Sequence, residues 1–199
     1  LYAPLADTPT ARMVRNHELV HARITPRMAA ATICKRQKVT MEALQWSEDN
    51  RIGRFLDDRE MVDSEAITDS EADSIAQVCG GSDRSIAGAL LVNWFLPYQR
   101  DRLLGAFERR GIDAAILAMI ESRLEAMVRG VEVSALPRRR GSYAARRRVF
   151  GSPTGFKKWT IPMARAFDFE FPEGGSGGDK REPGDVATAQ RLKTVKGVG

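Results

Sequence analysis

The sequence has 199 residues and a formal net charge of +5 at pH 7, and 43% of its residues are hydrophobic, which is enough for the core of one domain. The positive charge is local, because residues 138–148 hold six arginines while residues 57–73 are mostly acidic. This balance does not predict a protein that coats nucleic acid. The longest apolar stretch, residues 85–97, is shorter than the roughly 20 residues that cross a bilayer, so no membrane span is expected.

The two cysteines indicate whether the protein is expected in a reducing or an oxidising compartment. Cys34 and Cys79 lie far apart and form no C-x-x-C pair, so neither a disulfide framework nor a cysteine zinc knuckle is expected. No signal peptide is visible at the start of the sequence. We therefore expect two free thiols in a reducing compartment and a cytoplasmic location.

Apolar residues at helical spacing, bounded by capping residues, predict a series of helices. In chain order these run from Pro9 to Pro26, from Thr40 to about Asp58, from Thr68 or Asp69 to Gly80, from Ser82 or Asp83 to Leu96, over 98–110, and over 112–129. Two short alternating stretches, 131–136 and 167–171, are candidates for edge strands, but neither supports a sheet.

The fold class predicted from these elements is mainly α, a multi-helix domain with little or no sheet over residues 1–171. From Pro172 onward the sequence is rich in glycine, proline and charge and carries few apolar residues. Such a composition cannot bury a core. Residues 172–199 are therefore predicted to be a linker or a flexible tail.

The chain contains two histidines, His17 and His21, and Glu18 follows the first directly. On a helix, residues four apart project from the same face, so both imidazoles can reach one metal ion. Zn²⁺ suits this pair, and Glu18 is placed to take a proton from a water that the metal activates. This is the H-E-x-x-H arrangement of zinc metallopeptidases, which predicts a zinc-dependent hydrolase with Glu18 as general base.

A catalytic zinc site needs a third protein ligand, and the chain has no third histidine. Glu48 is the strongest candidate, because it interrupts an apolar helical stripe between Leu44 and Ile52. A buried carboxylate is costly when it is unpaired, but not when it binds a cation. The neighbouring Asp49 is then expected to accept the second N–H of a ligand histidine.

Two alternatives to Glu48 as the ligand stay open. Glu48 can instead lie at the solvent edge of its stripe and pair with Arg51 or Arg54. The acidic segment at 68–76 can supply the third ligand through Asp69 or Glu71, although an acidic first turn stabilised by the helix dipole explains that segment as well.

Residues 15–26 and 43–56 together resemble a family of metallopeptidases from bacteria and their phages, which carry H-E-x-x-H followed by an E-D-x-R-I helix. The resemblance covers about residues 10–60 with motifs. It implies zinc ligands at His17, His21 and Glu48, a catalytic Glu18, a gluzincin-like site and a peptide or protein substrate.

Members of that family usually continue into a von Willebrand factor A-type domain related to that of cobalt-chelatase subunits. Such a domain carries Asp-x-Ser-x-Ser after an apolar strand. The nearest string, residues 83–87, lacks the last serine and has no strand before it. We therefore expect this chain to lack the A-type domain.

The segment 136–159 favours a different function. It interleaves arginines with four aromatic residues, Tyr143, Phe150, Phe156 and Trp159. Arginines neutralise phosphates and aromatic rings stack on bases, so a nucleic-acid-binding or assembly module that uses residues 138–148 is the main alternative. A solvated basic surface explains the same charges, and a zincin scaffold without catalytic activity is a further alternative.

Overall fold

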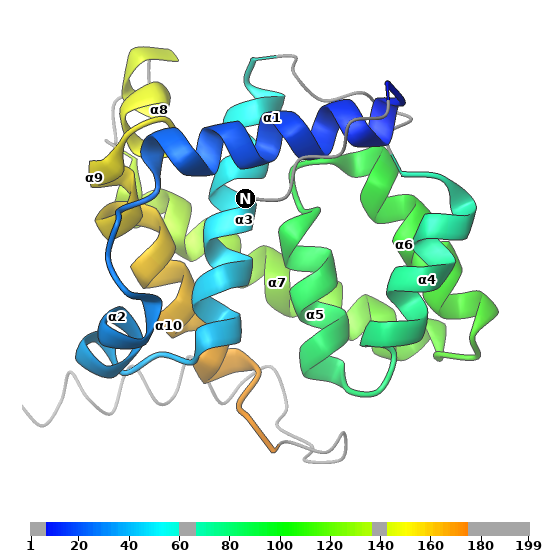
Figure 1. Cartoon of the computed structure of the whole chain (residues 1–199). Coiled ribbons are helices and arrows are strands. Elements are labelled where there is room, and N and C mark those ends of the chain that lie inside the picture. Colours follow the sequence, from blue (N-terminus) through cyan, green and yellow to red (C-terminus); the bar gives the residue numbers. More distant parts are fainter. Residues whose placement is uncertain (1–6, 60–66, 137–142, 175–199) are drawn as a thin grey trace, which may run out of the picture.

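The computed structural model describes residues 7–59, 67–136 and 143–174, and this part of the chain is helical and contains no strand (Figure 1). The predicted mainly α fold is confirmed. The elements are α1 (Pro9–Ile24), α2 (Ala30–Gln37), α3 (Met41–Asp57), α4 (Asp69–Cys79), α5 (Asp83–Val92), α6 (Pro97–Arg109), α7 (Ala114–Ala135), α8 (Tyr143–Phe150), α9 (Pro153–Gly155), the π-helical turn η1 (Phe156–Thr160) and α10 (Ile161–Glu170).

None of the helices in these ranges is both long enough and apolar enough to span a membrane. The predicted tail begins at Pro172, and all but its first three residues lie outside the described ranges. Residues 137–142, which open the arginine-rich segment, lie outside them too.

The predicted starts of four helices are confirmed, and each has a side-chain cap. The capping residues accept a hydrogen bond from a backbone N–H of the first turn, which leaves one fewer unsatisfied donor at each helix start. These residues are Thr8, Thr40, Thr68 and Ser82. Short polar residues in front of an apolar stripe therefore fix where these helices begin.

The two predicted edge strands are wrong. Helix α7 continues through Gly130 to Ala135, and α10 includes residues 167–170. In both segments apolar residues four apart also fit a helical stripe, and packing of that stripe against the core selects the helix, which leaves Val133 and Phe169 exposed. Helix α5 also ends at Val92 instead of Leu96, and the sequence predicted neither α2 nor the helices α8 to α10.

Helix α3 lies at the centre of the fold and contacts α1, α2, α5, α8, η1 and α10 (Figure 1). The side of α3 that faces η1 is buried and polar in part. The indole of Trp159 donates to the Asn50 amide oxygen at 3.0 Å, and the Asn50 amide nitrogen donates to the Leu91 carbonyl at 2.8 Å. These buried hydrogen bonds hold η1 and α5 to α3 and leave the α1 side of α3 for the candidate site.

Candidate metal centre

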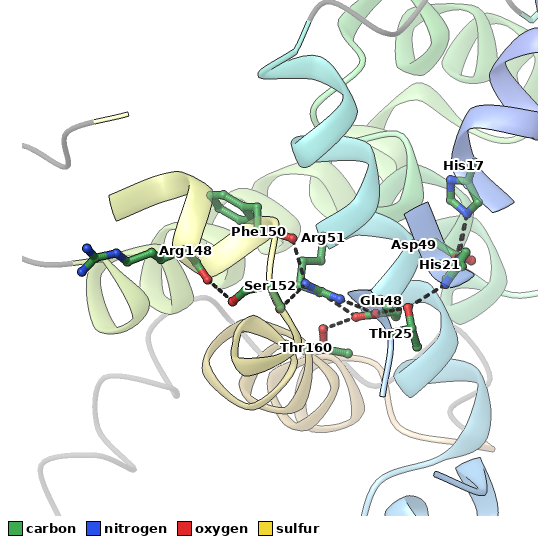
Figure 2. A network of polar contacts seen from close by, with 10 residues as sticks. All are labelled: His17, His21, Thr25, Glu48, Asp49, Arg51, Arg148, Phe150, Ser152 and Thr160. Carbon is green, nitrogen blue, oxygen red and sulfur yellow. Dashed lines mark hydrogen bonds and ion pairs between the residues drawn. The ribbon is translucent and has the colours of Figure 1, made fainter. Parts of the chain in front are cut away.

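Helix α1 crosses α3 and presents both histidines to it (Figure 2). Val20 and Ile24 of α1 pack with Ile52 and Leu56 of α3 in a small apolar cluster. Val20 and Ile24 lie four residues apart on one face of α1, so this contact fixes the rotation of the helix. His17 and His21 therefore point toward the same turn of α3.

Three ligand-type atoms meet between α1 and α3. The Nε2 atoms of His17 and His21 are 3.0 Å apart, and they lie 3.3 Å and 2.9 Å from Oδ1 of Asp49. In the described part of the chain, these are the histidine, cysteine, aspartate and glutamate side chains that group closely enough to hold a metal ion. The edges of a tetrahedral zinc site with bonds of 2.0–2.1 Å measure about 3.3 Å, so the observed spacing suits zinc.

The site is charged and partly open. Burial raises the pKa of the Asp49 carboxyl, but hydrogen bonds from His17 and His21, together with their charges, outweigh burial and hold the pKa below its usual value. Asp49 is therefore a carboxylate at neutral pH. The two imidazole side chains keep 25% and 24% of their surface exposed, so the three ligand-type atoms can be reached from solvent.

The structure corrects the sequence prediction for Glu48. Its side chain is buried, as predicted, but its two oxygens accept four hydrogen bonds (Figure 2). Two come from Arg51 at 2.8 and 2.5 Å, one from Thr160 at 2.5 Å and one from Thr25 at 2.6 Å. Arg51, three residues further along the helix, thus neutralises Glu48, and the carboxylate beside the imidazoles belongs to Asp49.

Comparison of the chain with protein-family models, with curated proteins and with solved structures gives no match. The resemblance to phage and bacterial metallopeptidases therefore stays a prediction. The argument for a function rests on the geometry between α1 and α3.

The other acidic candidates lie elsewhere. Glu71 forms a capping box with Thr68 at the start of α4, and Asp69 pairs with Arg102 at 3.8 Å. This is the helix-start role that the sequence offered as the alternative. Glu18, the predicted base, is half-buried on α1 and makes no hydrogen bond or ion pair with another described residue.

The aromatic residues of the basic segment are in the core. Phe150, Phe156 and Trp159 are buried, and the rings of Phe150 and Trp159 lie 4.7 Å apart. Their faces are not available to nucleic-acid bases, which removes this support for a base-stacking surface. The side chain of Tyr143 and residues 137–142 lie outside what the structure describes.

Sequence reasoning missed Thr25, which accounts for the position of His21. Its hydroxyl lies 3.0 Å from Nδ1 of His21 and donates to Glu48. Thr25 is the C-cap of α1 with extended backbone angles, φ −77° and ψ 133°. The signal was in the sequence, because Pro26 disfavours helical backbone at the residue before it. A threonine four residues after His21 and just before a proline therefore ends the helix next to that histidine.

Proposed function

We propose that the protein is a zinc-dependent hydrolase whose metal is held by Nε2 of His17, Nε2 of His21 and Oδ1 of Asp49. The observation that carries the proposal is the mutual distance of 2.9–3.3 Å among these three atoms, which come from two separate helices. A set of two imidazoles and one carboxylate is a donor set that zinc accepts in catalytic sites.

The hydrogen-bonding pattern around His21 supports a cation between the three ligand-type atoms. The Thr25 hydroxyl donates its proton to Glu48, which Arg51 also holds, so the Thr25 oxygen can only accept from Nδ1–H of His21. When the ring of His21 is neutral, Nε2 then carries a lone pair 2.9 Å from the Asp49 oxygen. A cation bound between Nε2 and Asp49 would take the place of the proton that the two atoms otherwise share.

Glu18 completes the proposal. Bound zinc would lower the pKa of a coordinated water to about 7. Glu18 lies on the same helix next to His17, and its carboxylate is not engaged in another described contact. It would accept the proton of the attacking water and deliver it to the leaving group. The H-E-x-x-H spacing favours peptides or proteins as the substrate class.

The test compares the whole chain with its Glu18→Gln variant. Zinc content is measured by mass spectrometry of the metal, and hydrolysis is followed by mass spectrometry of a mixed peptide library. We expect about one zinc per chain in both proteins and a rate lower by about 10²- to 10⁴-fold in the variant, the range typical of a general base. Glu18→Gln keeps the size of the side chain and removes the base.

Each other result points to a different conclusion. Unchanged hydrolysis in Glu18→Gln would contradict the role of Glu18. Zinc binding without any cleavage by the natural sequence would contradict the hydrolase proposal and favour the inactive scaffold. Salt-sensitive binding of DNA or RNA that a chelator does not affect would favour the nucleic-acid alternative.

A further inference from the structure

The buried ion pair beside the site is connected to it through one hydroxyl group. Arg51 is fully buried and donates to both oxygens of Glu48. Its other guanidinium nitrogen, Nη1, donates to the carbonyls of Phe150 and Ser152 at 2.8 and 3.0 Å. The Glu48 carboxylate is thereby held by Arg51 of α3, Thr25 and Thr160 of η1, and Arg51 in turn is held by the carbonyls at the end of α8 (Figure 2).

Thr25 links the fixed Glu48 carboxylate to His21, because its hydroxyl contacts both side chains. Its hydroxyl proton points to Glu48 at 2.6 Å, so its oxygen lone pair faces Nδ1 of His21 at 3.0 Å. An Nδ1–H bonded to this lone pair leaves Nε2 unprotonated in the neutral ring, and Nε2 is the atom that faces His17 and Asp49. Glu48 therefore acts on the site without touching it.

We propose that Glu48 and Thr25 are positioning residues that select the Nδ1–H tautomer of His21, and so set the zinc affinity of the site. The effect on zinc affinity rests on the proposed function, whereas the effect on the tautomer does not. Partners that hold the far nitrogen of a ligand histidine typically change metal affinity by 10- to 100-fold. Here the partner is a hydroxyl, and the charge behind it belongs to a buried ion pair.

The chain offers a matched pair of variants for the test. Thr25→Val and Thr160→Val each remove one hydroxyl that donates to Glu48, and both replacements keep the branched shape of the side chain. Thr25 also contacts His21, whereas the Thr160 hydroxyl donates to Glu48 alone among the described residues. A purely structural role for Thr25 predicts similar effects of the two variants on the metal site.

Two measurements separate the outcomes. Nitrogen-15 shifts of the imidazoles in metal-free protein at about pH 9, above the ordinary pKa of histidine, report the tautomer. Because the chain has two histidines, the spectra are simple. Competition with a zinc chelator reports affinity. We expect Thr25→Val to populate the Nε2–H tautomer and to weaken zinc binding by about 10- to 100-fold. We expect Thr160→Val to change neither property and Thr25→Ser to restore both.

The outcomes that overturn the proposal are distinct from those that overturn the function. If Thr25→Val leaves His21 in the Nδ1–H form, or if both valine variants shift zinc affinity equally, the proposal is overturned. If the natural sequence binds no zinc while Thr25→Val still changes the tautomer, the proposed function fails. The positioning role of Glu48 and Thr25 then stands.

Discussion

Glu48 and Asp49 are neighbours on α3, but their carboxylates lie in opposite kinds of environment. Glu48 is surrounded by donors, because Arg51, Thr25 and Thr160 all give it hydrogen bonds. Asp49 faces two imidazole nitrogens, which are acceptors whenever they carry a lone pair. The first carboxylate is held by four hydrogen bonds from the protein, whereas the second has two imidazole nitrogens beside it, which suits the cation that we propose.

This difference teaches that burial alone does not mark a metal ligand. Glu48 is 4% exposed and is the more deeply buried of the two residues, yet its charge is already balanced. The balance of donors and acceptors around each oxygen separates an ion pair that stabilises the fold from the site that we propose for an ion. Three substitutions can break or sharpen this comparison.

The largest expected effect on stability comes from Arg51→Met. The substitution leaves Glu48 buried without its ionic partner, which typically costs about 3–5 kcal/mol in the free energy of unfolding. Urea denaturation measures the loss. The matched control is Arg109→Met on α6, which removes an exposed pair with Asp73 at 2.8 Å and should cost at most about 1 kcal/mol. Equal losses in the two variants would contradict the central role of the buried pair.

Asp49→Ala should strongly weaken zinc binding, because it removes the carboxylate of the proposed site. Removing a direct ligand should weaken zinc binding beyond the 10- to 100-fold that is typical of an indirect partner, so we expect a loss of more than about 100-fold. Isothermal titration with zinc measures the affinity. Asp57→Ala removes an aspartate from the exposed end of the same helix and should leave zinc affinity unchanged. Retained affinity in Asp49→Ala would show that another group is the third ligand.

The smallest of the three effects concerns Gly155. A Cβ atom at this position would lie 1.6 Å from the Val149 carbonyl oxygen, in the turn that supplies the acceptors of Arg51. Gly155→Ala should therefore lower the free energy of unfolding by about 1–3 kcal/mol, as overpacking does. Gly130 in α7 has no heavy atom within 4 Å of its added Cβ, so Gly130→Ala should stabilise by roughly 0.5–1 kcal/mol. Thermal unfolding of both variants tests the difference in sign.

Much of the fold could be predicted from the sequence, because capping residues and apolar spacing are local signals. The errors in secondary structure lie in segments whose apolar residues fit both the spacing of a strand and the spacing of a helix. In a strand Phe167, Phe169 and Phe171 would share one face, whereas in a helix Phe167 and Phe171 share a face that Phe169 leaves. The structure buries Phe167 and Phe171 and exposes Phe169, as the helix requires. The contacts that decide between them come from the rest of the chain, and no local pattern contains them.

The candidate site also has a part that local signals predict and a part that depends on the rest of the fold. The spacing of His17 and His21 is a local signal, and the structure brings both imidazoles together with a carboxylate of the helix that the sequence indicated. Which carboxylate meets them depends on the rotation of α3, and this rotation is set by distant partners such as Trp159, whose indole donates to Asn50. Arg51, three residues after Glu48, was the local sign that Glu48 already had a partner.

The most direct test of a cation between α1 and α3 is an anomalous difference map at the zinc edge, from crystals of the whole chain grown with zinc. We predict one strong peak about 2.0–2.2 Å from Nε2 of both histidines and from an oxygen of Asp49, with Glu48 still bonded to Arg51. A map without a peak at this position, or a peak coordinated by Glu48 in place of Asp49, would contradict the assignment.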